Sequence, residues 1–244
     1  MRGGNMSTLT RFCDVHEAVL STSVAANFKA RATHLDALKV IAFALMIFDH
    51  LAMFAVWPYV TRIPGRLVLP MFAVALAYKV ANYSSGKAFR RLTIYALISQ
   101  PIVMLLGIYY LNILFTLAVG IGVGTASKQR LILCLPILLW LHLIDLSTPW
   151  THIEYGIPGV MTVALCVWAI KRPWLYLVAA LVINASYVGQ PLGGIVASIA
   201  LLIVAAYVHQ ETLFAWVARV PTHAWYALYP VHLLALWAFV QLFT

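Results

Sequence analysis

The chain has 244 residues, of which 64% are hydrophobic and 9% are charged, and its mean hydropathy is +0.92. This composition leaves too little polar surface for a soluble domain of that length, so we expect a membrane protein. The formal net charge of +9 does not indicate nucleic acid binding, because the 16 Lys and Arg residues are scattered in short segments between apolar runs.

Residues 1–34 mix Ser, Thr, Arg and small apolar residues and are predicted to form a cytoplasmic extension. They lack the charged start and the apolar core of about 7–15 residues that a cleavable signal peptide needs. We therefore expect the first apolar run to direct membrane insertion. Residues 35–244 are assigned to a single transmembrane domain.

Apolar runs of about 17–25 residues can cross a bilayer as helices, and polytopic proteins also contain shorter ones. The sequence predicts about nine such spans joined by short connections. They are residues 37–57, 67–83, 91–107, 111–126, 131–147, 157–171, 174–188, 191–208 and 224–243. The expected fold is therefore an all-α, polytopic bundle of transmembrane helices.

The Lys and Arg residues between the spans predict an orientation, because cytoplasmic loops are enriched in them. One side of the predicted bundle has only Arg62 and Arg66, together with Asp145 and Glu154 beside a loop without cations. The other side carries Arg2, Arg11, Lys29, Arg31, Lys87, Arg90, Arg91, Lys128, Arg130, Lys171, Arg172 and Arg219. The N-terminus is accordingly predicted inside and the C-terminus outside.

The first span contains the strongest functional lead, since Lys39, Asp49 and His50 lie within it and Asp36 lies just before it. An ionisable group costs roughly 2.5–3.5 kcal/mol at a bilayer centre, so it rarely persists without a partner or a role. The eleven-residue step from Lys39 to His50 places both within roughly 20° of one helix face, about 16 Å apart. A neutral imidazole can take and return a proton near neutral pH, which favours His50 as a general base.

Asp49 is a candidate for the acid that orients His50, yet neighbouring residues of a helix point about 100° apart. Asp49 can instead pair with a cation on another helix. His50 would then take an acidic or carbonyl partner elsewhere. A buried network that only joins helices remains the alternative.

Further polar residues lie in or beside the other spans, and each alone is a weak signal. They are Arg66, Lys79, Gln100, Asn112, His142, Asp145, Asn184, Tyr229 and His232. Hydrogen bonds between helices are the expected role of intramembrane Asn and Gln, and Lys79 is expected to reach toward the cytoplasmic surface. His232 follows Pro230 by two residues, where a proline can open space for a ligand, and a packed histidine is the alternative.

Several common sites are absent from the sequence as patterns. There is no HExxH, GxSxG or Walker loop, so metal, acyl-serine and nucleotide-hydrolysis chemistry are not expected. Cys13, Cys134 and Cys166 form no CxxC pair and are expected to be packing residues. Close helix packing is expected at Gly156, Gly159, Gly193 and Gly194.

The motifs resemble, in order, those of the TraX family of conjugative pilin N-acetyltransferases. The first is Asp36 with Lys39, followed by ten residues and His50 within Phe48-Asp49-His50. The others are Gly65-Arg66, Pro70-Met71-Phe72, Gln100, Asn112-Ile113-Leu114-Phe115, Tyr155-Gly156-Ile157 and Tyr229-Pro230-Val231-His232-Leu233. The resemblance covers most of residues 34–240, and the spacing from Lys39 to His50 is also similar to that of a wider group of membrane acyltransferases.

The resemblance implies acetyl transfer from cytoplasmic acetyl-CoA to the N-terminal amine of a processed pilin at the bacterial inner membrane. His50, with Asp49 beside it, would be the catalytic base, and Lys39 with Asp36 would attract the donor's phosphates. The implied substrate-binding residues are Arg66, Gln100, Asn112, Tyr155, Tyr229 and His232, with Gln100, Asn112 or Tyr155 as donors to the oxyanion. No metal or permanently bound cofactor is expected, and the partners are the pilin, the bilayer and other conjugation proteins.

Three other functions stay open at this stage. One is a maturase that joins the two ends of a pilin without CoA. Another is a non-catalytic chaperone or assembly scaffold for pilin. A transporter is the last, although no inverted repeat supports it.

Overall fold

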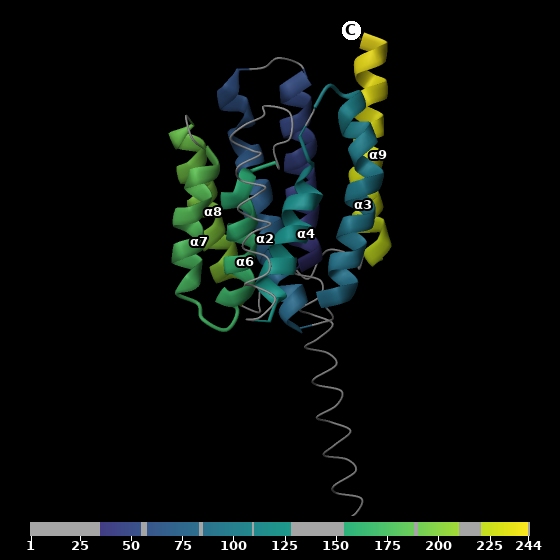
Figure 1. Cartoon of the computed structure of the whole chain (residues 1–244). Coiled ribbons are helices and arrows are strands. Elements are labelled where there is room, and N and C mark those ends of the chain that lie inside the picture. The colour runs from purple at the N-terminus through teal and green to yellow at the C-terminus, as the bar shows by residue number, and fades with distance from the viewer. Residues whose placement is uncertain are drawn as a thin grey trace, which may run out of the picture.

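The computed structural model describes residues 35–54, 58–82, 85–108, 110–127, 154–187, 190–209 and 221–243. Every element of regular secondary structure in these ranges is a helix, and the long helices lie side by side with roughly parallel axes (Figure 1). The all-α prediction is confirmed for this part of the chain.

The elements follow in chain order. After the first helix, Leu35–Phe54, come η1 (Tyr59–Leu67), α2 (Val68–Asn82), α3 (Ser85–Leu105), α4 (Ile113–Thr125), α6 (Gly156–Ala169), α7 (Leu175–Asn184), η2 (Ala185–Tyr187), α8 (Pro191–His209) and α9 (Thr222–Phe243).

Four of the described helical segments are long and apolar enough to cross a membrane: Leu35–Phe54, Val60–Asn82, Pro191–Val208 and His223–Leu242. Large apolar side chains such as Leu181, Ile203 and Leu242 are exposed on the outside of the bundle, where a soluble protein would place polar groups. The protein is therefore a membrane protein. The count of nine spans and the orientation stay predictions, and the predicted span 131–147 lies outside the described residues.

The predicted spans and the observed helices agree closely except at α3. This helix begins at Ser85, well before the predicted start at residue 91. Its first turns carry Lys87, Arg90 and Arg91, which lower the local hydropathy without disfavouring a helix. Hydropathy therefore finds the apolar part of the helix and misses its polar beginning.

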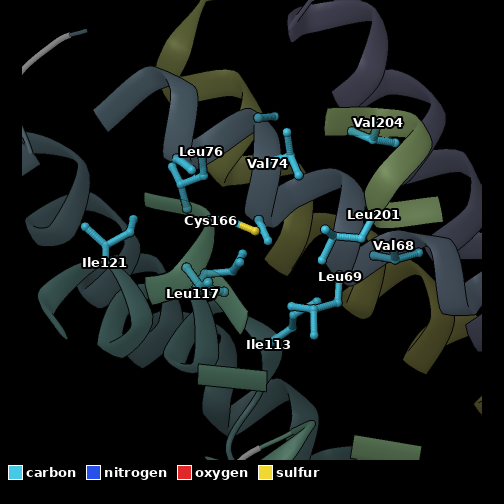
Figure 2. Packing of buried hydrophobic residues seen from close by; sticks show 14 of the residues in the cluster. Val68, Leu69, Val74, Leu76, Ile113, Leu117, Ile121, Cys166, Leu201 and Val204 are labelled. Atoms are coloured by element: carbon cyan, nitrogen blue, oxygen red, sulfur yellow. The ribbon is translucent and has the colours of Figure 1, made fainter. Parts of the chain in front are cut away.

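α2 lies at the centre of the bundle and packs against α4, α6 and α8. Its residue Leu69 is fully buried and belongs to one apolar cluster with Leu117 of α4 and Leu201 of α8 (Figure 2). Cys166 of α6 is also fully buried in this core, which confirms its predicted packing role. Cys13 and Cys134 lie outside the described residues.

Glycines allow two pairs of helices to approach closely. A Cβ atom added to Gly120 of α4 would lie 2.5 Å from the Cβ of Val163 in α6. At Gly194 of α8 it would lie 2.5 Å from the side-chain oxygen of Asn184 in α7. The packing role predicted for Gly194 is confirmed, because a Cβ there would displace the Asn184 side chain and already lie 3.4 Å from the Cα of Asn184.

Candidate functional site

His50 and His232 form the centre of the site, although 182 residues separate them in the sequence. Nδ1 of His50 lies 3.1 Å from Nε2 of His232, and the two rings are nearly parallel, with an interplanar angle of 9°. The first helix supplies one histidine and α9 supplies the other. The sequence predicts an acidic or carbonyl partner for His50, and at Nδ1 the structure places the imidazole of His232 from α9.

Asp49 does not face His50 and pairs with Arg62 of η1, as the helix geometry requires. Nε of Arg62 donates to one carboxylate oxygen at 3.2 Å, and its second nitrogen donates to the other at 3.3 Å. The two side chains remain partly exposed, at 27% for Arg62 and 16% for Asp49. The pairing predicted between Asp49 and a cation outside its own helix is confirmed.

A cavity of about 260 Å³ begins at this pair of residues and includes Met53 in the last turn of the first helix. We call it the outer cavity. It is lined by Asp49, His50, Met53, Arg62, Arg66, Tyr110, Glu154, Tyr155, Ser186, Tyr187 and Gln190. Arg66 lies over the Tyr187 ring at 5.3 Å. Its two arginines and two carboxyl groups make this a polar chamber that could hold a peptide end.

The turn before α6 holds Glu154 and Tyr155 against this chamber. Tyr155 has a φ of 68° and Gly156 a φ of 59°, a left-handed conformation that costs free energy at a tyrosine. The Glu154 amide donates to the Leu111 carbonyl at 2.8 Å, and Thr116 of α4 donates its hydroxyl to the Glu154 carbonyl. The turn is thus fixed from both sides.

Burial raises the pKa of the Glu154 carboxyl to about 7. The nearby Asp49 carboxylate raises this pKa as well. The Ile113 amide, which donates to the carboxylate, and the guanidinium groups of Arg66 and Arg62 act in the opposite direction. Glu154 therefore exchanges a proton near neutral pH, next to His50.

A smaller cavity of about 10 Å³, roughly the size of one water, lies directly behind the outer one. We call it the middle cavity. It shares Asp49, His50, Glu154 and Tyr155 with the outer cavity. Met46 and Ile113 line its other side.

A third cavity, of about 70 Å³, extends from Met46 and Ile113 toward the start of the first helix, and we call it the inner cavity. Its wall is mostly apolar, and two ammonium groups, those of Lys39 and Lys79, line it as well. Lys39 bonds to Asp36 at 2.8 Å and lies over the Trp225 ring at 5.5 Å. Three cavities therefore follow the first helix from Lys39 to His50 and beyond.

A family model with the description TraX protein matches residues 34–240. The chain belongs to the TraX family. Membership indicates a function connected with the pilin of a conjugal transfer system. No curated protein and no solved structure matches the chain.

Asn112 and Gln100, two of the motif residues of this TraX family member, belong to a network of hydrogen bonds within the protein. Asn112 caps α4, since its side-chain oxygen accepts from the Leu114 amide at 3.0 Å. Its amide group donates to the Ala96 carbonyl and to Gln100, each at 3.0 Å, and Gln100 donates to the Tyr110 carbonyl at 3.0 Å. Asn112 thus already uses both amide hydrogens, whereas Gln100 uses one of its two, for the bond to Tyr110 in the connection between α3 and α4.

The remaining predicted residues are placed beside the cavities. Arg66 and Tyr155 line the outer cavity, and Tyr229 lines the inner one. The Tyr229 ring also contacts that of His232, with centroids 5.2 Å apart. His142 and Asp145 lie outside the described residues.

The sequence interpretation assigned no site role to Arg62, Glu154 or Lys79. Lys79 lines the inner cavity and lies over the Tyr226 ring at 5.8 Å, so it does more than reach for the surface. A charged residue in or beside an apolar run was the available signal for all three. Among the residues that the structure describes, no three His, Cys, Asp or Glu side chains gather as a metal site would require.

Proposed function

We propose that this TraX family member is an acyltransferase that acetylates the N-terminal amine of a processed pilin, with His50 as general base. The observation that carries the proposal is the position of His50 between two cavities of different chemistry. On one side lies a largely apolar cavity with two ammonium groups, and on the other a polar chamber lined by two arginines and two carboxyl groups. The chemistry of the apolar cavity suits a thioester donor, and that of the polar chamber suits a peptide acceptor.

The inner cavity suits acetyl-CoA. Lys39 and Lys79 would attract the phosphates, and the buried indole nitrogen of Trp225 has no hydrogen-bond partner in the described part of the chain. The apolar wall, which includes Phe43 and Met46, would enclose the pantetheine arm. Since Lys39 and His50 share a face about 16 Å apart, an extended donor can reach from one to the other.

The outer cavity suits a peptide end with an amine. Asp49 and Glu154 place carboxylates beside His50, where an ammonium group would enter. An α-amino group, with an ordinary pKa near 7.7–8.0, supplies a neutral nucleophile more readily than a lysine with a pKa near 10.4. Arg66 would hold an oxygen of the peptide farther out.

The chemistry then needs one base that also acts as an acid. The neutral amine attacks the thioester carbonyl carbon, a C–N bond forms, and His50 takes the proton from the nitrogen. The C–S bond of the tetrahedral intermediate breaks, and His50 returns the proton to the thiolate. The products are the N-acetylated peptide and CoA, and an acceptor that enters as an ammonium releases one further proton. Tyr155 or the second amide hydrogen of Gln100 would donate to the oxyanion.

The location that we propose is the bacterial inner membrane. The Lys and Arg pattern would place Lys39 and Lys79 near the cytoplasm, which contains acetyl-CoA. His50 and the outer cavity would then lie toward the side from which the processed pilin arrives.

The test is co-expression with the cognate pilin, followed by intact and N-terminal peptide masses. Wild type, His50→Ala, the exposed control Lys87→Ala and a strain without the protein are compared at equal expression. An acetyl increment on the N-terminal amine, present in wild type and Lys87→Ala and absent in the other two, is the expected result. Loss of one water indicates joining of the pilin ends, and an unchanged mass in every sample indicates a scaffold; either outcome overturns the proposal.

A further inference from the structure

We infer that His232 is a positioning residue that holds His50 in the tautomer with its proton on Nδ1, so that Nε2 of His50 is the reactive nitrogen. The reactive role of Nε2 rests on the proposed function. The tautomer itself follows from the hydrogen bonds of the two rings.

The Leu228 carbonyl determines the tautomer of His232. Nδ1 of His232 lies 3.2 Å from this oxygen. A carbonyl oxygen can only accept a hydrogen bond, so Nδ1 of His232 carries a proton. In a neutral imidazole the other nitrogen then has the lone pair, and Nε2 of His232 must be an acceptor.

The tautomer of His232 in turn determines that of His50. Its Nδ1 is 3.1 Å from Nε2 of His232. Because that nitrogen of His232 accepts, Nδ1 of His50 has to donate and carries the proton. The lone pair of His50 is therefore on Nε2. His50 lines the outer cavity, in which the acceptor would lie, and the middle cavity behind it.

His232 is held firmly enough for this task. It is 7% exposed and sits one turn after Leu228 on α9. The rings of Phe43 and Tyr229 contact its ring edge to face, with centroids 5.1 and 5.2 Å away. These contacts come from the first helix and from α9, so the ring orientation depends on the packing of both.

The same bonds argue against His232 as a second proton carrier. A proton that His50 passed to Nε2 of His232 would have to leave from Nδ1, and the group bonded there is a backbone carbonyl. A neutral amide oxygen is far too weak a base to take up that proton. The relay would end at His232, whereas a fixed orienting partner needs no exit.

The direct test is 15N magic-angle-spinning NMR of histidine-labelled protein in lipid nanodiscs, where protonated and unprotonated imidazole nitrogens have well-separated shifts. The chain has eight histidines, so a His50→Gln sample identifies the resonances of His50. We expect a protonated Nδ1 and an unprotonated Nε2 at His50 in the resting protein. The opposite assignment overturns the inference whether or not the protein transfers acetyl groups.

Three variants link the tautomer to turnover. His232→Gln keeps a side-chain oxygen near the place of Nε2 and should retain the tautomer and most of the rate. His232→Leu keeps the volume and removes the acceptor, so the NMR signals of His50 should show a mixture of tautomers. Partners that orient metal-bound imidazoles are typically worth about 10–100-fold, and we expect kcat to fall by a similar factor with KM for acetyl-CoA unchanged.

The exposed neighbour Leu234→Ile is the matched control on α9 and should behave like wild type. An equal loss of kcat in His232→Gln and His232→Leu, with the tautomer of His50 unchanged in both, contradicts a positioning role. Absence of transfer by wild type with every acceptor would remove the proposed function and leave the NMR result to decide the tautomer.

Discussion

Gly65 lies where Asp49 leaves no room for a side chain: a Cβ atom at Gly65 would be 2.5 Å from the Cβ of Asp49. Real Cβ atoms do not approach so closely, so a residue larger than glycine must displace the aspartate or η1. The glycine thereby sets how near η1 comes to the first helix. Arg62 and Arg66, which flank it on η1, depend on that approach.

Gly65→Ala should consequently disturb the Asp49–Arg62 pair. We expect acetyl transfer to fall roughly 10-fold or more, because a shift of about 1 Å at a catalytic centre can cost 10²-fold. Gly86→Ala is the control, since a Cβ there meets nothing within 4 Å. The rates of the two purified variants give the answer, and equal rates would show that the approach of η1 does not matter.

Arg62→Gln should leave the Asp49 carboxylate without its guanidinium partner. Since the pair is partly buried, we expect a loss between that of a surface pair and a buried one, about 1–3 kcal/mol. The thermal midpoint of the variant in detergent measures this loss. Arg62→Lys keeps the charge and should recover part of it. A midpoint equal to wild type for Arg62→Gln would contradict a stabilising pair.

Lys79→Met should weaken the donor site and leave the acceptor site intact. Removal of one ammonium group should raise KM for acetyl-CoA roughly 5–20-fold, because a charge-assisted hydrogen bond is worth about 1.5–3 kcal/mol before solvent screening. KM for the pilin peptide should stay the same. The exposed Lys87→Met has the same change of charge and should alter neither constant; a change in the peptide constant alone would place Lys79 elsewhere in the reaction.

Glu154→Gln should remove a pH dependence of stability. The folded-state pKa of Glu154, about 7, lies above the ordinary value of 4.5, so the folded protein binds the extra proton. The stability that this proton supplies is complete below pH 4.5 and is lost as the pH rises through about 7.

The melting temperature of Glu154→Gln relative to wild type should therefore increase between pH 5 and pH 8, measured in one detergent at constant ionic strength. Gln can still accept from the Ile113 amide, so the comparison isolates the charge. A difference that is constant over this range would show that burial does not raise the pKa of Glu154.

Asn112→Ala should destabilise the protein without changing kcat. The variant loses the cap of α4 and the bonds to Ala96 and Gln100, for which we expect about 2–4 kcal/mol. Asn82→Ala, which loses one exposed bond to Tyr78, should change the stability by less than about 0.5 kcal/mol. Thermal midpoints and kcat decide between a structural role, which leaves kcat of the folded protein unchanged, and an oxyanion role, which lowers it.

The sequence predicts the helices well because their apolar runs are long. It also predicts that Asp49 does not pair with His50, because neighbouring residues of a helix point in different directions. It cannot predict the partner of His50. That partner lies on α9, and no local period connects residues of two helices so far apart in the chain. η1 is also missed, since the sequence analysis places residues 58–66 in a short connection between two spans, whereas Tyr59–Leu67 forms a 3-10 helix of nine residues.

The motifs identify positions near the site more reliably than they identify roles. Asn112 and Arg66 both belong to the ordered set of motifs, yet one caps a helix and the other lines a cavity. A role depends on which hydrogen-bond donors are already used, and this is known only when the helices are packed. Glu154 belongs to none of the motifs and still lines the site, because its loop carboxylate becomes buried only through the turn that holds it.

Met46 and Ile113 belong to the walls of both the inner and the middle cavity. A partition of two apolar side chains is a poor path for ions and hydrated protons, whereas a thin, flexible molecular arm can pass between such side chains. A bundle built in this way can exchange a chemical group between two compartments while the electrical insulation of the membrane is preserved. The cell would keep its proton gradient even while the site is turning over.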